Sequence, residues 1–408
     1  MAMAGPAGSV RPARTISPPG VMSAALVGAG LALPFLRVKA NRLVPGEPLR
    51  LPEALAVLPA GAGWVALALL VALALVALPG QVGARGRAVA GALGVVLGAV
   101  LLGLAARGLV AAAAPPAGGG GAAMARVSPA SGFWLVVLGF GLMAGDGLSR
   151  LRPGPVQGWI LLAAAVAVAI GLPASGVLDA VSVMVEHAAR AEAFSRALRE
   201  HLVLAFGSSA LALAAGLPLG VALFLRPRWR GAVLGVLNMV QTVPSLALFG
   251  LLIPLLGALA RHVPGLAALG VAGIGPFPAL VALFLYALLP VVANTLAGLL
   301  AVPASVREAA RGLGMTRAQR LVQVELALAL PMILAALRIA LVQNIGLAVI
   351  AGLIGGGGFG SFVFQGLNQT AMDLVLLGAL PTILLALVAG IGLDLAIRSL
   401  GPQGGRAP

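Results

Sequence analysis

Apolar stretches of about 20 residues recur along this chain, separated by short polar segments. Each is long enough to cross the hydrocarbon of a bilayer as an α-helix that rises about 1.5 Å per residue. The chain is 61% hydrophobic and only 9% charged, whereas a soluble domain carries about 25% charged residues. We therefore predict an all-α polytopic membrane protein with ten spans, at about 20–37, 54–79, 86–113, 131–148, 156–174, 202–225, 231–257, 277–301, 331–353 and 374–397.

The longest polar interruption, residues 175–200, divides these spans into two groups. Before it we predict a cytoplasmic tail at 1–19 and an accessory membrane region of about five spans at 20–174. After it we predict a second membrane domain at 201–400 and a disordered Gly/Pro-rich tail at 401–408. The interruption itself has apolar residues near one helical face, which indicates an amphipathic periplasmic connector on the membrane surface. A docking surface for a partner protein is the alternative.

The distribution of basic residues predicts the orientation of the chain. The formal charge is +15, but the basic residues stand in ones to fours between apolar runs, which does not indicate a nucleic-acid interface. Cytoplasmic loops carry an excess of Lys and Arg. In residues 201–408, one orientation of the spans places nine of the 11 basic residues on the cytoplasmic side of the membrane and only Arg261 on the outer side. In the N-terminal half, the same orientation places six basic residues on the cytoplasmic side and nine on the outer side, so the predicted number of spans is supported less well there. Both termini are predicted to be cytoplasmic.

Residue counts exclude several chemistries. The chain has no cysteine, and its three histidines are too scattered for a metal cluster. A Walker A motif needs a Lys followed by Ser or Thr, but the single lysine, Lys39, precedes Ala40. Any ATP hydrolysis must therefore be carried out by another subunit. Residues 355–360 formally match a dinucleotide fingerprint, but no βαβ unit surrounds them, so close packing or a flexible turn is favoured. We predict no catalytic, cofactor-binding or metal-ligating residue.

The polar loop at 303–330 carries the strongest local signals. Two capping-box patterns predict two short helices, Ser305-x-x-Glu308 and Thr316-x-x-Gln319. Gly314 lies between them as the predicted C-cap. The first helix has an apolar stripe, from which Arg307 and Arg311 are predicted to point away: Val306, Ala309, Ala310 and Leu313. Such a helix suits a groove on another protein, and a membrane-surface hairpin without a partner is the alternative.

Several polar residues are predicted to lie within spans, where they are costly in hydrocarbon. They are Gln241, Thr242, Ser245, Asn294, Thr295, Gln343 and Asn344. One interpretation is that they line a polar translocation pathway. The other is that they form hydrogen bonds between helices and hold the bundle together.

At the 303–330 loop the chain resembles a known family. The segment Glu308-Ala309-Ala310-x-x-x-Gly314 is similar to the EAA motif of ABC-importer permeases. The family pattern continues after the glycine with Ile-x-Leu-Pro, and this chain has Val324-Glu325-Leu326-Ala327 there. Ala327 in place of the proline is expected to change how the second helix meets the next span, without removing the match.

Further stretches resemble the osmoprotectant uptake permeases of the glycine betaine/choline/carnitine class. They occur in order over about 195–400, as Glu200-His201-Leu202, Gly216–Gly220, Gln241–Leu248, Leu289–Thr295 and Ile354–Leu367. The extra N-terminal spans resemble the YehY-like branch of this class. The resemblance implies a five-helix ABC type I (MetI-like) permease core at 201–400, with its EAA loop at 303–330.

The resemblance also implies partners and roles. In such importers two permease subunits form the channel, ATPase subunits bind ATP and Mg²⁺, and a solute-binding protein delivers the substrate from outside. This chain would then be a lipid-embedded permease of the bacterial inner membrane and no enzyme. The residues that transmit ATPase motion would be Glu308, Ala309, Ala310 and Gly314 by motif position, with Arg307, Arg311 and Leu313 beside them.

Alternatives remain at this point. Methionine, phosphonate and sulfonate permeases share the EAA core, so the substrate could be another small solute. A stand-alone secondary carrier would often place acids mid-span, whereas Asp146 and Asp394 lie near span ends. A membrane enzyme would need a polar catalytic set, but Ser208, Ser209 and Ser245 have no His or Lys partner at a recognisable spacing. No aromatic cage for a quaternary ammonium group is evident, so we expect the separate binding protein to select such a substrate.

Overall fold

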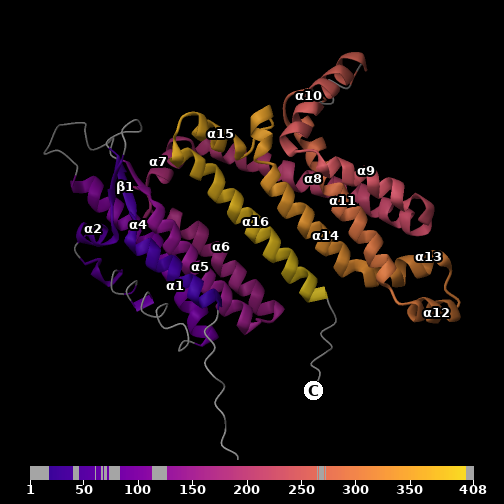
Figure 1. The fold of residues 1–408 in the computed structure, drawn as a ribbon, viewed down its shortest axis with the longest axis horizontal. Helices are drawn as coiled ribbons and strands as arrows, with labels where there is room; N and C mark the ends of the chain where they lie inside the picture. Colours follow the sequence, from indigo (N-terminus) through magenta and orange to yellow (C-terminus); the bar gives the residue numbers. More distant parts are fainter. Residues whose placement is uncertain are drawn as a thin grey trace, which may run out of the picture. The chain divides into compact units, whose positions relative to one another are not determined.

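The computed structural model describes residues 18–39, 46–59, 61–65, 68, 71–72, 83–112, 126–263, 265, 271 and 273–400. Eight helices within these ranges are long and apolar enough to cross a membrane, which confirms the all-α polytopic fold. The chain divides into two compact units, each described below by itself (Figure 1). The first unit is Met1–Pro153 with Val168–Val185, and the second is Gly154–Ala167 with Glu186–Pro408.

The first unit contains a bundle of three apolar helices, α1 (Pro18–Ala32), α4 (Ala84–Ala112) and α5 (Ser131–Leu151). Helix α5 packs against both α1 and α4. Glycines allow this close approach, as in many membrane bundles. A Cβ on Gly91 would lie 2.4 Å from the backbone nitrogen of Ala144. A larger side chain at this position would therefore separate α4 from α5.

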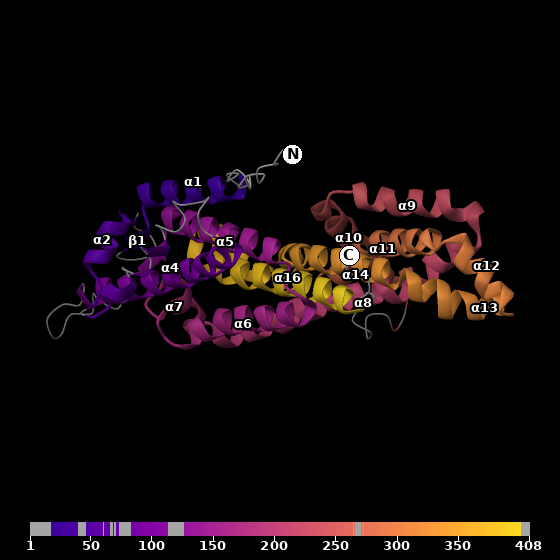
Figure 2. The same ribbon diagram turned by 90° about the horizontal axis from the view of Figure 1, so that it is seen from below.

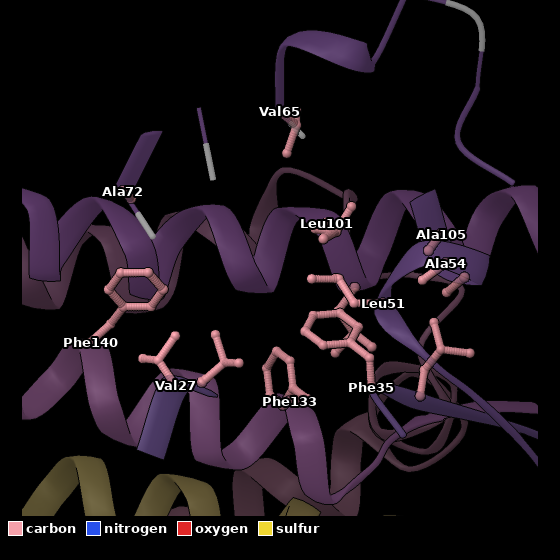
Figure 3. Packing of buried hydrophobic residues seen from close by; sticks show 14 of the residues in the cluster. Val27, Phe35, Leu51, Ala54, Val65, Ala72, Leu101, Ala105, Phe133 and Phe140 are labelled. Carbon is pink, nitrogen blue, oxygen red and sulfur yellow. The ribbon is translucent and has the colours of Figure 1, made fainter. Parts of the chain in front are cut away.

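A small antiparallel sheet belongs to the same unit, with strand order β2-β1-β3. Its strands are β1 (Leu36–Lys39), β2 (Glu47–Leu49) and β3 (Arg126–Pro129), and helix α2 (Leu51–Ala56) follows β2 directly. Leu36 of β1 pairs with Leu49 on one side and Pro129 on the other. Figure 3 shows Phe35, at the start of this sheet, packed with Phe133 and Leu101 in the unit's buried core.

These elements differ in part from the predicted N-terminal spans. The span predicted at 20–37 is a helix only to Ala32, and β1 follows it. The span predicted at 54–79 lies largely outside the described residues. Those predicted at 86–113, 131–148 and 156–174 correspond to α4, α5 and α6 (Pro155–Ala174). The tail at 401–408 and residues 1–17 also lie outside the described residues.

The second unit is built around three helices, α8 (Ala191–Leu225), α11 (Pro276–Ala301) and α14 (Leu326–Leu347). Helix α11 packs against α8 and α14, and α14 packs against α16 (Met372–Leu400). Helix α15 (Gly360–Asn368) packs on α16 and lies at the opposite end of α14 from the 303–330 loop (Figure 1). The loop is thus held at one end of a continuous helical bundle.

Two features of this unit were not predicted. Helix α8 begins at Ala191, so the second half of the expected connector at 175–200 is a helical extension of the following span, and α7 (Ser182–Ala189) precedes it. The expected span at 231–257 is two helices, α9 (Arg230–Thr242) and α10 (Ser245–His262). Pro244 disfavours helical backbone in the preceding residue, and Val243 is accordingly extended, at φ −68° and ψ 127°.

Candidate functional site

The candidate site is helix α12 (Ala304–Gly312) with the turn that follows it. Gly314 has φ +77°, a conformation that glycine adopts at little cost. The backbone nitrogen of Met315 donates to the Ala310 carbonyl at 3.2 Å, and that of Gly314 donates to Arg311 at 3.0 Å. This pair of bonds is a Schellman motif. The prediction of Gly314 as the C-cap glycine is confirmed.

The two predicted capping boxes have different outcomes. Thr316 and Gln319 form theirs: the Gln319 nitrogen donates to Thr316 Oγ1 at 3.3 Å, and the Thr316 nitrogen donates to Gln319 Oε1 at 2.9 Å. The box predicted at Ser305 is wrong, because Pro303 is the N-cap of α12 and no side chain caps it. Proline fixes φ near the helical value, so the helix begins at Ala304 and Ser305 already lies inside its first turn.

The exposed face of α12 differs from the predicted stripe. Ala310 is buried and Val306 is half-buried, but Ala309 is exposed and the Leu313 side chain is 83% exposed. Glu308 and Arg311 are exposed beside them. An exposed leucine next to small and charged residues, on a short helix at the end of the bundle (Figure 2), is a surface that another protein can cover.

Arg307, which was predicted to lie off the apolar stripe, points into the bundle. Its Nη2 donates to the carbonyl of Leu299, near the end of α11, at 2.7 Å. Its guanidinium carbon lies 5.4 Å from the ring centre of Phe224, near the end of α8, within the range of a cation–π contact. Arg307 therefore ties α12 to the ends of two spanning helices.

Glu325 is the functional candidate that the sequence analysis missed. Its side chain is 3% exposed, and its Oε1 lies 3.1 Å from Arg320 Nε and 3.6 Å from Arg307 Nε. Arg320–Glu325 is a π-helical turn between α13 (Arg317–Gln319) and α14. Residues five apart are hydrogen-bonded neighbours in a π-helix, which brings Arg320 and Glu325 together. An acidic residue directly before a long apolar run was the signal that could have identified it.

The predicted pathway residues form their hydrogen bonds with different partners. Gln241 Nε2 donates to the Tyr286 carbonyl at 2.7 Å and joins α9 to α11. Thr242 and Asn294 bond to carbonyls of their own helices, those of Met239 and Pro290. Ser245 and Gln343 are half-buried, on α10 and α14.

The remaining two candidates lie in helix–helix contacts. Thr295 is buried, and a Cβ on Gly220 would lie 2.7 Å from its Cβ, which shows how closely α11 meets α8. Asn344 of α14 is fully buried, and its Nδ2 donates to Ser208 Oγ at 2.8 Å and Ser209 Oγ at 3.2 Å on α8. This geometry favours the helix-joining interpretation for Asn344.

A double-mutant cycle on Asn344 and Ser208 tests that interpretation directly. In a cycle of Asn344→Ala, Ser208→Ala and the double variant, we expect each change to lower the free energy of unfolding. The coupling between them should be about 0.6 kcal/mol, typical of interhelical hydrogen bonds in membranes. Reversible unfolding in mixed micelles measures it. Additive effects of the two single changes would contradict a joining role.

The glycine-rich segment at 355–360 connects α14 to α15 through a tight turn. Gly355, Gly357 and Gly358 all have φ between 74° and 78°. The backbone nitrogen of Gly358 donates to Glu200 Oε2 of α8 at 2.8 Å. A Cβ on Gly360 would lie 1.8 Å from the carbonyl oxygen of Val349. These contacts confirm the interpretation of this run as a tight packing element.

Comparison with known proteins matches both halves of the chain to families. Residues 17–184 match the family described as "ABC transporter permease YehY, N-terminal domain". Residues 212–403 match "Binding-protein-dependent transport system inner membrane component". The second match includes α12, the π-helical turn and Asn344.

Individual relatives match the same C-terminal region. The chain is 38% identical over 205 residues to the "Choline transport system permease protein OpuBB" of Bacillus subtilis, covering 50% of this chain and 87% of that one. It is 43% identical over 190 residues to the "Osmoprotectant import permease protein OsmW" of Salmonella typhimurium, covering 46% and 83%. A solved structure of the MetNI methionine ABC transporter is 26% identical with a TM-score of 0.44, covering 51% and 96%.

Proposed function

This chain belongs to the ABC-importer permeases, the inner-membrane components of binding-protein-dependent transport, and on that premise we propose that it forms part of the translocation pathway for an osmoprotectant such as glycine betaine, choline or carnitine. The substrate class rests on the relatives, whose names specify choline or osmoprotectant transport at 38% and 43% identity.

Helix α12 carries the coupling role in this proposal. Its exposed residues, Glu308, Ala309, Arg311 and Leu313, form the surface offered to the ATPase, while Ala310 and Arg307 seat the helix against the bundle. Gly314 ends the helix so that this surface is presented in one orientation. The single observation that supports the role best is Leu313, an apolar side chain 83% exposed beside the EAA motif.

The partners follow from the family. ABC-importer permeases work with an ATPase and a solute-binding protein. We propose that a second permease subunit, identical or different, completes the pathway, and that ATP and Mg²⁺ bind only to the ATPase. The chain would lie in the bacterial inner membrane with α12 and both termini on the cytoplasmic side. Gln241, Thr242, Ser245, Asn294, Thr295 and Gln343 are proposed as residues along or next to the pathway, with Asn344 supporting it.

Uptake into proteoliposomes tests the proposal. The chain is reconstituted with an ATPase and a solute-binding protein from the same organism, and labelled glycine betaine, choline and carnitine are offered in turn. We expect uptake that needs internal ATP and falls at least about tenfold when the binding protein is omitted, a size typical of coupling between sites. Labelled methionine is the matched control and should not enter.

Two outcomes would contradict different parts of the proposal. Uptake by the chain alone, driven by a sodium or proton gradient, would replace the importer with a secondary carrier. ATP-dependent uptake of methionine but of none of the three osmoprotectants would keep the importer and overturn the substrate class.

A further inference from the structure

A buried carboxylate lies behind the candidate docking helix and faces two arginines. Glu325 is 3% exposed, whereas the side chains of Arg320 and Arg307 are 17% and 25% exposed. A buried charge is unfavourable unless it is paired. Glu325 is paired twice, and its two partners come from different segments, the π-helical turn and α12.

The same arginine reaches two further helices. Arg307 donates to the Leu299 carbonyl of α11 and lies over the Phe224 ring of α8. Through Glu325 it is also joined to the N-terminal end of α14, because Glu325 is the N-cap of that helix. One side chain of the docking helix therefore contacts the ends of three spanning helices, and Glu325 supplies the charge that holds it there.

An irregular backbone geometry coincides with this junction. The carboxylate belongs to a π-helical turn, a rare geometry that often marks functional sites and helix irregularities. Without the extra residue of this turn, Arg320 and Glu325 would lie on different faces, because an α-helix brings residues three or four apart together. The turn is thus what directs the carboxylate toward α12.

We propose, resting on the function proposed above, that Glu325 is a positioning residue through which displacement of α12 is transmitted to α14. When the ATPase moves α12, the Arg307–Glu325 pair moves the start of α14 with it. Without the carboxylate, Arg307 has no charged partner on α14, and α12 can move while the spanning helices stay in place. The ATPase would then turn over without transport.

The Glu325→Gln variant of the assembled importer tests this inference. The glutamine keeps the shape of the side chain and removes its charge. We expect ATPase co-purification and basal hydrolysis close to wild type, but glycine betaine transported per ATP hydrolysed should fall about fivefold or more. Arg307→Lys keeps the charge and loses the planar fork that reaches Leu299, so it should give an intermediate ratio.

Glu192→Gln is the matched control. It removes the same charge from a pair with Arg196 on α8 that is exposed on both sides, at 3.2 Å, and should leave the transport ratio unchanged. A wild-type ratio in Glu325→Gln would overturn the inference. Loss of ATPase co-purification in that variant would overturn it too, because Glu325 would then maintain the loop without transmitting motion.

A second measurement does not depend on transport. The chain has no cysteine, so spin labels can be placed at introduced cysteines in place of Leu313, directly after α12, and Leu328 on α14, both exposed. In the permease alone, the distance distribution between the labels should be narrow, and it should broaden in Glu325→Gln. Identical distributions would overturn the inference. If the wild-type complex does not bind an ATPase at all, the proposed function fails instead.

Discussion

Replacing Gly314 by valine is expected to lower the amount of ATPase that co-purifies with this permease by about tenfold. Gly314 has φ +77°, where a side chain costs about 1–2 kcal/mol and a β-branched one more. A cost of 1.4 kcal/mol corresponds to a factor of ten at equilibrium. A Cβ added at this position would meet no atom within 4 Å, so the expected cost comes from the backbone conformation and not from a clash of the Cβ.

The consequence of that strain is the loss of the end of α12. Without the Schellman bonds from Gly314 and Met315 to Arg311 and Ala310, the last turn no longer holds Leu313 in its exposed position. The matched control is Gly314→Asn, because asparagine adopts the left-handed conformation more readily than other residues. Equal recovery of the ATPase with the valine and asparagine variants would show that the geometry of this turn does not matter for docking.

Replacing Gly360 by alanine is expected to lower the free energy of unfolding by about 3 kcal/mol, the upper part of the usual cost of overpacking. The new Cβ would lie 1.8 Å from the Val349 carbonyl oxygen, and the next nearest atoms are also backbone of Val349. No flexible side chain can move aside. The turn between α14 and α15 would have to open, and the bond from Gly358 to Glu200 would be disturbed with it.

Gly346→Ala is the control for this second prediction. Gly346 is exposed near the end of α14, and a Cβ there meets nothing within 4 Å. Alanine is favoured over glycine in a helix by about 1 kcal/mol, so this variant should be as stable as wild type or slightly more. Thermal unfolding in detergent, followed by size-exclusion chromatography, compares the two. If the Gly360→Ala protein unfolds at the same temperature as wild type, the turn accommodates the added methyl group without loss of stability, and the prediction is wrong.

The length of the apolar runs was sufficient to predict most spanning helices, because a run as long and apolar as that of α11 is not stable in contact with water. It failed at Pro244, where hydropathy is continuous but the backbone must turn. The EAA loop was recognisable because its signals are local: Gly314 requires a particular φ, and Thr316 bonds to a residue three positions on.

The burial of Glu325 could not be predicted in the same way. Its environment is made by Arg307, 18 positions earlier in the chain, and by a π-helical turn that no local pattern announced. The contacts of Arg307 with Leu299 and Phe224 could not be predicted either, since helical periodicity on α12 says nothing about where the ends of α8 and α11 lie. Asn344 shows the same limit, because only the packed structure places it against Ser208 and Ser209.

The length of α8 has a mechanical consequence. From Phe194 to Phe224 it rises through 30 residue steps and thus about 45 Å, well beyond the roughly 30 Å of hydrocarbon in a bilayer. The Phe194 ring contacts the Phe359 ring beside the glycine turn, with the two rings tilted by 44°, and Phe224 lies under Arg307. Pro218 removes a backbone hydrogen bond near the Phe224 end, so flexing is favoured there. Phe224 lies six residues from Pro218 and Phe194 lies 24 residues from it, so a rotation of the helix about Pro218 would move Phe194 about four times as far as Phe224.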